Sequence, residues 1–365
     1  GNEAEGNTVR IPEMFSVLLN AVGFSSIPEI PTGPFTYSEA VFAATHNSYS
    51  GDLDTETAAG VFSAATTSGE RGGVLEQLDA GVRFVELDVF AHTFDTDGYT
   101  IGHGYGGACD GALAPGAAYT FAQCKAALSD LSPCALDGGT GCEVDHGKPE
   151  TDTLNNPSSN VLVDWLRQIS SWSNVHPTHS PITIGLDVKH TPPVFPTAAL
   201  DAMVRTEFLN IFTPAELAAH REARGGAGWP LVDHMRGKVL FVLTGNVPAR
   251  VAYLEDLEDV PYDTGSGPSN SSGAVMFSEY SPGEPEALKE ENHFFAAAST
   301  MSQDDYAHIE CIKLRMCPFR VYRYDLVGSV YAGGGPTPTF PAADYPYAPS
   351  YNAELVATGR LPAAV

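Results

Sequence analysis

Short apolar runs alternate with longer amphipathic runs along most of the chain. The apolar runs have the length and composition of strands, while the amphipathic runs place apolar residues on one helical stripe. Eight strands are predicted, at Val41–Asn47, Val82–Phe90, Tyr99–Gly102, Ile182–Val188, Lys238–Thr244, Ala274–Glu279, His293–Ala298 and Arg320–Asp325. Helices are predicted between several of them, at Gly73–Ala80, Asn160–Trp172, Leu200–Phe212 and Pro214–Arg224.

Strands that alternate with helices favour a parallel sheet covered on its faces by helices. Runs such as Val239–Leu243 are apolar at every position, which is typical of strands buried on both sides. Eight such units favour a closed barrel. An open doubly wound sheet is the alternative, but no G-x-G-x-x-G motif follows the first strand. We therefore expect an α/β fold, a distorted TIM-like (β/α)8 barrel in a single domain.

Proline, glycine and cysteine divide the chain around this barrel. Residues 1–36 form an irregular and partly helical lead-in that is broken by prolines. We expect the catalytic barrel over 37–330 and a Pro/Ala-rich tail over 331–365 that packs on it. Segment 105–181 is long for one connection, so we interpret it as a disulfide-tied insertion after the third strand, over the barrel mouth.

The six cysteines fall into two groups that are local in sequence. They are Cys109, Cys124, Cys134, Cys142, Cys311 and Cys317. None forms a C-x-x-C pair, which argues against a zinc site. An even number in local groups favours disulfides and a secreted, extracellular protein, although six cysteines allow 15 pairings. Free buried thiols in a cytosolic enzyme are the alternative.

The net charge of −26 makes nucleic acid an improbable partner, because phosphate binding needs a basic surface. No apolar run approaches the length of a membrane span. We expect a monomer.

Acidic residues stand at the ends of two of the most apolar strands. Glu86 and Asp88 are two positions apart, so on a strand both point to the same side. Two aligned carboxylates inside an apolar strand are costly to bury without compensation. A divalent cation would provide it, and the nearby Arg83 is the alternative. Asp187 stands at the end of the fourth strand with Lys189 two positions later, which is also compatible with a plain ion pair.

Two histidines stand at the ends of the first and third strands. His46 is followed by Asn47, and His103 follows the third strand. A lone histidine at such a place is more often structural, but the C-terminal ends of barrel strands converge on one face, where barrel enzymes have their active sites. The set therefore predicts metal-assisted cleavage of a phosphodiester. His46 would donate to a phosphoryl oxygen and His103 would protonate the leaving oxygen.

Oxygen donors dominate the predicted metal site. One Ca²⁺ takes 6–8 oxygen ligands, and the candidates are Asn47, Glu86, Asp88 and Asp187. This number of protein ligands leaves positions for oxygens of a substrate.

These residues resemble motifs of the phosphatidylinositol-specific phospholipases C. The first strand's turn reads His46-Asn47-Ser48-Tyr49, and the second strand matches Gly-x-Arg-x-x-Glu-x-Asp over Gly81–Asp88. Asp97-Gly98 then precede His103-Gly104, and Asp187 matches the acid of the fourth strand. The resemblance covers about 41–104 and 181–190. Because metal-free relatives replace the cation with arginine, the acids point to the calcium-dependent, secreted bacterial-type branch.

The resemblance implies a reaction in which the inositol 2-hydroxyl attacks phosphorus. Diacylglycerol leaves and a cyclic inositol phosphate forms, which is either the final product or is opened by water in a second step. The implied catalytic residues are His46, His103, Asp187 and Glu86, with one bound Ca²⁺. The implied partner is a phospholipid at a membrane or micelle surface.

One departure from the family concerns the head group. Eukaryotic members carry lysines on the fifth strand, where this chain has Val239–Leu243, so we expect unphosphorylated phosphatidylinositol as the better substrate. Strand-end placement suggests substrate contacts from Lys189, Glu279, Arg323, Tyr324 and Asp325.

Two alternatives remain open. A glycerophosphodiester phosphodiesterase has a similar Glu-x-Asp strand but carries His-Arg-Gly where this chain has His46-Asn47-Ser48. A secreted, non-catalytic Ca²⁺- or lipid-binding barrel is the alternative from another class, and the presence of both histidines argues against it.

Overall fold

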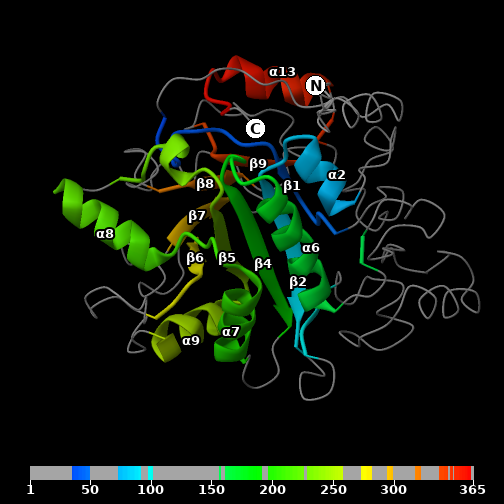
Figure 1. Ribbon diagram of the computed structural model, residues 1–365, viewed down its shortest axis with the longest axis vertical. Helices are drawn as coiled ribbons and strands as arrows, with labels where there is room; N and C mark the ends of the chain where they lie inside the picture. Colours follow the sequence, from blue (N-terminus) through cyan, green and yellow to red (C-terminus); the bar gives the residue numbers. More distant parts are fainter. Residues whose placement is uncertain are drawn as a thin grey trace, which may run out of the picture.

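Eight parallel strands close into a ring in the computed structural model of the protein (Figure 1). The structure describes residues 35–49, 73–91, 98–101, 156–157, 161–190, 196–225, 228–257, 273–281, 294–298, 317–321, 337–343, 346–347 and 349–362. The ring contains β1 (Ala44–Thr45), β2 (Phe84–Phe90), β4 (Ile182–His190), β5 (Val239–Gly245), β6 (Phe277–Tyr280), β7 (Phe294–Ala298), β8 (Phe319–Val321) and β9 (Phe340–Ala343). It closes because β1 pairs with both β9 and β2, so the predicted barrel is confirmed.

Two strands differ from the prediction made from the sequence. The third predicted strand is β3 (Thr100–Ile101), which pairs antiparallel with the end of β2 and therefore is not a member of the parallel ring. The ring is completed instead by β9, which lies within 331–365, the segment expected as a tail. A short run containing Pro341 gives a weak strand signal, because proline lacks a backbone donor.

Helices cover the outside of the barrel. They are α2 (Val74–Asp79), α6 (Leu162–Val175), α7 (Thr197–Glu207), α8 (Pro214–Arg224), α9 (Val247–Leu257) and α13 (Pro349–Ala357), with a 3-10 turn at Val232–Met235. Helices α2, α6, α7 and α9 contact one another in this order around the ring (Figure 1). The boundaries of α8 follow from local chemistry: Thr213 and Glu216 form a capping box, and Gly225 ends the helix at φ +63°.

Alternation along β2 separates two apolar environments. Val85, Leu87 and Val89 face outward and pack under the helices. Phe84 faces inward and joins a second cluster that fills the barrel toward the N-terminal ends of the strands, where its ring lies 5.0 Å from that of Phe340. Because side chains alternate with period two, Glu86 and Asp88 face inward like Phe84, but nearer to the C-terminal strand ends.

Most of the predicted insertion and the lead-in lie outside the described residues. Helix α6 is the part of 105–181 that the structure describes at length. Cys317 is buried and is not a free thiol, but the other five cysteines also lie outside the described residues. The disulfide-tied insertion therefore stays a prediction.

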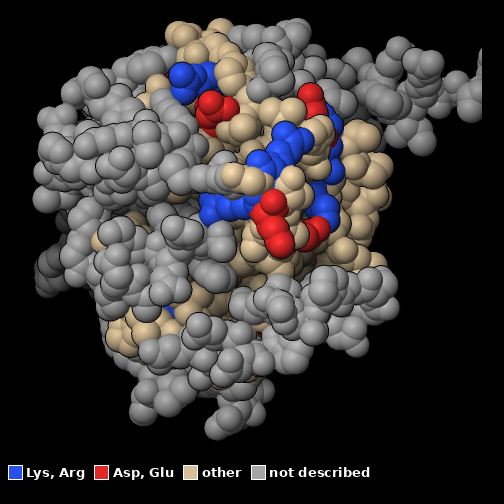
Figure 2. Space-filling model, turned by 90° about the vertical axis from the view of Figure 1, so that its left-hand side faces the viewer, with Lys and Arg blue, Asp and Glu red and all other residues tan. Residues whose placement is uncertain are grey.

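The described surface around α8 mixes both signs of charge, although the chain is strongly acidic overall. Lys238 pairs with Glu216 at 2.9 Å, and Arg236 pairs with Asp233 at 2.9 Å. Figure 2, which shows this side of the molecule, has basic and acidic side chains next to one another. Among the described helices, none is long and apolar enough to cross a membrane.

A buried histidine between α6 and β4 predicts that stability depends on pH. The Nδ1 of His179 donates to the Ser180 carbonyl at 2.7 Å, which leaves Nε2 to accept from the Ser173 hydroxyl at 2.7 Å. Burial, with smaller contributions from the charges of Arg83 and Arg236, lowers the pKa of His179 to about 4, although the hydrogen bond to the Ser180 carbonyl opposes the shift. The pKa of this histidine in the unfolded chain is about 6.5. At pH values between about 6.5 and 4, the unfolded chain therefore binds a proton that the folded protein does not.

We expect this histidine to remove about 3 kcal/mol of stability as the pH falls from 7 to 4. Urea denaturation at a series of pH values would measure the loss, and His179→Gln should flatten the curve in this window. The exposed His234→Gln is the matched control and should leave the curve unchanged. Identical curves for wild type and His179→Gln would contradict the prediction.

Candidate active site

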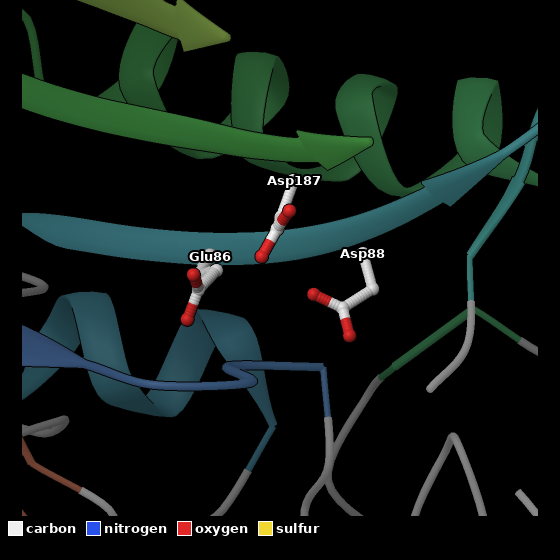
Figure 3. Close-up of side chains that lie close together, drawn as sticks. All are labelled: Glu86, Asp88 and Asp187. Carbon is white, nitrogen blue, oxygen red and sulfur yellow. The ribbon is translucent and has the colours of Figure 1, made fainter. Parts of the chain in front are cut away.

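Three carboxylates meet inside the barrel at the C-terminal ends of β2 and β4. Strand pairing places Asp88 beside Asp187, with Glu86 two residues before Asp88 on the same face. Carboxylate oxygens of all three lie within 4.8 Å of one another, and the side chains point into the same space (Figure 3). All three residues are buried, so their mutual repulsion is poorly screened by water.

Two cationic side chains offset part of this charge. The Lys189 Nζ lies 2.9 Å from Asp187 Oδ2 and 3.2 Å from Asp88 Oδ2. Arg320, from β8 across the barrel, donates to Glu86 Oε1 at 2.7 Å and reaches Glu279 Oε1 at 2.8 Å. Among the described residues, these four carboxylates thus share two cationic side chains, which leaves an excess of acidic groups in a buried space.

The pKa shifts in the site follow from burial and from these partners. Burial raises the pKa of Asp187, but Lys189, Arg320 and His46 outweigh it and hold the pKa below its usual value. Burial dominates at Glu279 and raises its pKa to about 7, although Arg320 opposes the shift. Asp187 is therefore ionised at neutral pH, whereas Glu279 is close to its midpoint.

The turn after β1 is tied to the acidic strand by several hydrogen bonds. Asn47 has φ +46°, a left-handed conformation that asparagine tolerates, and its N–H donates to Glu86 Oε2 at 3.2 Å. The Glu86 N–H donates to Ser48 Oγ at 2.8 Å, and the Ser48 carbonyl accepts from Gln77 Nε2 at 2.8 Å. The Tyr49 hydroxyl donates to Asp88 Oδ2 at 3.0 Å. His46 and Asn47 are thus held next to the carboxylates.

The three acids and the neighbouring asparagine suit a hard divalent cation. Calcium prefers oxygen ligands, and carboxylates on adjacent strands provide several within a short distance. Arg83, considered from the sequence as an alternative partner of the acids, points away from them. Its guanidinium donates to Ser180 Oγ and the Leu78 carbonyl at 2.8 Å each and lies over the Trp172 ring.

Seven of the site residues predicted from the sequence lie at this end of the barrel in the described part of the chain. They are His46, Asn47, Glu86, Asp88, Asp187, Lys189 and Glu279. The other four lie outside the described residues: His103, Arg323, Tyr324 and Asp325. Their roles stay predictions.

Arg320 is the main residue that the sequence analysis missed. The eighth strand was expected over Arg320–Asp325, and the described strand β8 is Phe319–Val321. Arg320 points into the barrel, because it contacts Glu86 and Glu279 there. Its guanidinium also lies over the Phe84 ring, 5.5 Å from the centroid. A single arginine inside an apolar run was the available signal, because a buried charge requires a partner of opposite sign.

Two solved structures with a similar fold are described as phospholipases C. The chain is similar to a calcium-dependent phosphoinositol-specific phospholipase C from a Gram-negative bacterium, Pseudomonas sp, with 18% identity, a TM-score of 0.53 and coverage of 91% of this chain and 98% of that chain. It is also similar to a Ca²⁺-dependent phosphatidylinositol-specific phospholipase C from Streptomyces antibioticus, with 16% identity, a TM-score of 0.50 and coverage of 88% and 97%. At these identities the likeness shows the fold.

The family comparison is more specific. Residues 150–304 match the family described as phosphoinositide phospholipase C, Ca²⁺-dependent. The matched segment includes Asp187, Lys189 and Glu279, while His46, Glu86 and Asp88 lie before it. No curated protein sequence matches the chain. The resemblance seen in the sequence is confirmed over this segment, and the matched family is the expected class of enzyme, a phosphodiesterase of the phospholipase C type.

A glycine at the end of β5 predicts a test of the metal site. Gly245 has φ +77°, and a Cβ there would lie 2.0 Å from Asp187 Oδ1 and 2.5 Å from the Val188 carbonyl oxygen. Any side chain would therefore displace the Asp187 carboxylate. We expect Gly245→Ala to weaken Ca²⁺ binding at least about 10-fold, measured by titration calorimetry.

Gly225→Ala is the matched control for this prediction. Gly225 also has a positive φ, +63°, but a Cβ added to it would meet no other atom within 4 Å. This variant should lose about 1 kcal/mol of stability from backbone strain and keep the Ca²⁺ affinity of the wild type. Equal affinities in both variants and the wild type would show that Asp187 does not hold the cation.

Proposed function

We propose that the protein cleaves the phosphodiester bond of phosphatidylinositol in a Ca²⁺-dependent reaction that yields diacylglycerol and a cyclic inositol phosphate. The observation that carries the proposal is the convergence of Glu86, Asp88 and Asp187 at the C-terminal mouth of the barrel. The family match, which contains Asp187, supports the same substrate class.

Asn47, Glu86, Asp88 and Asp187 are the proposed ligands of one Ca²⁺. When bound, the ion would offset the charge of the phosphate and acidify the attacking inositol hydroxyl. Lys189 keeps Asp88 and Asp187 together when the ion is absent, since its ammonium contacts both. The Asn47 N–H and Arg320 orient opposite oxygens of the Glu86 carboxylate.

Two histidines are the proposed proton-transfer groups. His46 lies close enough to Asp187 to lower the pKa of that carboxylate, so it is also close to the proposed cation site. We assign it to the phosphoryl oxygen and His103 to the leaving oxygen. Lys189, Glu279, Arg323, Tyr324 and Asp325 are the proposed head-group contacts, and Arg320 joins them because it bridges Glu86 and Glu279.

The proposal extends to the setting of the reaction. The protein acts as a secreted monomer on phospholipid at a membrane or micelle surface, and the grouped cysteines support an oxidising compartment. The acidic site and the absence of lysine from β5 favour an unphosphorylated inositol ring.

Product release from defined micelles tests the function directly. We expect the protein to release diacylglycerol from phosphatidylinositol with millimolar Ca²⁺ and to lose this activity in excess chelator. The kcat/KM for phosphatidylinositol 4,5-bisphosphate should be lower than that for phosphatidylinositol. Phosphorus NMR should show a cyclic inositol phosphate as a product. Asp88→Asn should reduce release strongly, whereas Asp233→Asn, an exposed aspartate, is the matched control. Full activity in chelator would contradict the metal. Glycerol 3-phosphate from glycerophosphodiesters, without cleavage of phosphatidylinositol, would favour the alternative phosphodiesterase.

The histidine roles predict a dependence on the leaving group. His46→Ala and His103→Ala should each lower turnover of the natural lipid by about 10²–10⁴-fold. His103→Ala should recover on a substrate with an activated leaving group, because such a group needs no general acid. His220→Ala on α8 is the control, and far-UV circular dichroism would check folding. Turnover of the natural lipid at the wild-type rate would remove the mutated histidine from the mechanism.

A further inference from the structure

Thr244 presents a buried hydroxyl at the C-terminal end of β5. The residue is 0% exposed. In the part of the chain that the structure describes, its Oγ1 has no hydrogen-bond partner. Leaving a buried hydroxyl unsatisfied costs about 1–3 kcal/mol. A threonine where valine would fit the strand equally well therefore needs an explanation, and a ligand that completes its hydrogen bonding is one.

The position of Thr244 is set by the register of three strands. Asp88 pairs with Asp187, and Asp187 pairs with Thr244, so these three side chains share the inner face at one level of the barrel. On the other side of β5, Leu243 pairs with Ser278 of β6, so the next residue of β6, Glu279, lies beside Thr244. The hydroxyl thus lies between a proposed cation ligand and the partner of Arg320.

The neighbours of Thr244 determine which ligand fits. Asp187 is held by Lys189, and Glu279 is held by Arg320. A phosphate at Thr244 would stand between two carboxylates and be repelled by at least one of them. A neutral hydroxyl of a ligand can both donate to a carboxylate and exchange a hydrogen bond with Oγ1. The chemistry of this position is that of a polyol subsite.

We propose that Thr244 is a specificity-determining residue whose hydroxyl binds one hydroxyl of the substrate's polyol head group. The inference rests on the proposed function and deepens it, because it assigns a ring contact to β5. It predicts that Thr244 contributes to substrate binding at the expense of the stability of the free protein.

The variant that isolates this hydroxyl is Thr244→Val, which keeps the shape of the side chain. Because the hydroxyl is unsatisfied in the free protein, Thr244→Val should leave the Tm unchanged or raise it. The same variant should lower kcat/KM for phosphatidylinositol about 2- to 13-fold, the range for one neutral hydrogen bond. Thr244→Ser keeps the hydroxyl and should restore most of kcat/KM.

Substrate analogues identify the partner of the hydroxyl. We expect one member of a series of phosphatidylinositols, each lacking a single ring hydroxyl other than the 2-hydroxyl, to be cleaved equally well by wild type and Thr244→Val. The other members should keep the full difference between the two proteins. A difference that is the same for every analogue would overturn the proposal.

Other outcomes also overturn it and separate it from the proposed function. A parallel loss of Tm and activity in Thr244→Val would give the residue a structural role. A drop in Ca²⁺ affinity by more than about 10-fold, measured calorimetrically without substrate, would assign the hydroxyl to the cation. A kcat/KM of Thr244→Val equal to that of the wild type would rule out the proposed contact between Thr244 and the head group. By contrast, failure of the wild-type protein to cleave phosphatidylinositol with Ca²⁺ would refute the proposed function itself.

Discussion

The structure depends on compensating three carboxylates buried inside a barrel. Glu86, Asp88 and Asp187 repel one another in a space from which water is largely excluded. Lys189 reaches two of them from the end of β4, and Arg320 reaches the third from the opposite side. Because Arg320 is 234 residues from Glu86, this ion pair exists only when the ring of strands is closed. Site and barrel therefore stabilise each other.

The two halves of the barrel interior have different tasks. Toward the N-terminal strand ends, Phe84 and its aromatic neighbours form a close-packed floor. Gly185 leaves room for the Phe84 ring, since a Cβ there would lie 2.9 Å from it. Above this floor, Gly245 leaves room for the Asp187 carboxylate in the same way. The two glycines thus make room for an aromatic ring and for a candidate metal ligand. Close packing around Phe84 and Asp187 helps to hold the polar groups in place at the mouth of the barrel.

Several features could be predicted from residue patterns because they are local. The spacing of Glu86 and Asp88 implied that both face one side of a strand, and the structure confirms it. The apolar runs at β4 and β5 indicated a buried parallel sheet. The prediction of strands failed where the apolar run was short or where the run was compatible with both a parallel and an antiparallel strand. The run at β3 belongs to an antiparallel hairpin, and β9 contains a proline and only a few residues.

The sequence by itself determined the barrel class, the inward-facing acids and the histidine-asparagine turn, because periodicity and motif spacing depend only on neighbours along the chain. Tertiary structure decided which side chains meet. The pairing of Arg320 with Glu86, the contact of Gly245 with Asp187 and the place of Thr244 between Asp187 and Glu279 all depend on strand order and register. A pattern gives the side of a strand that a residue occupies, but only closure of the barrel brings the opposite wall within hydrogen-bonding distance.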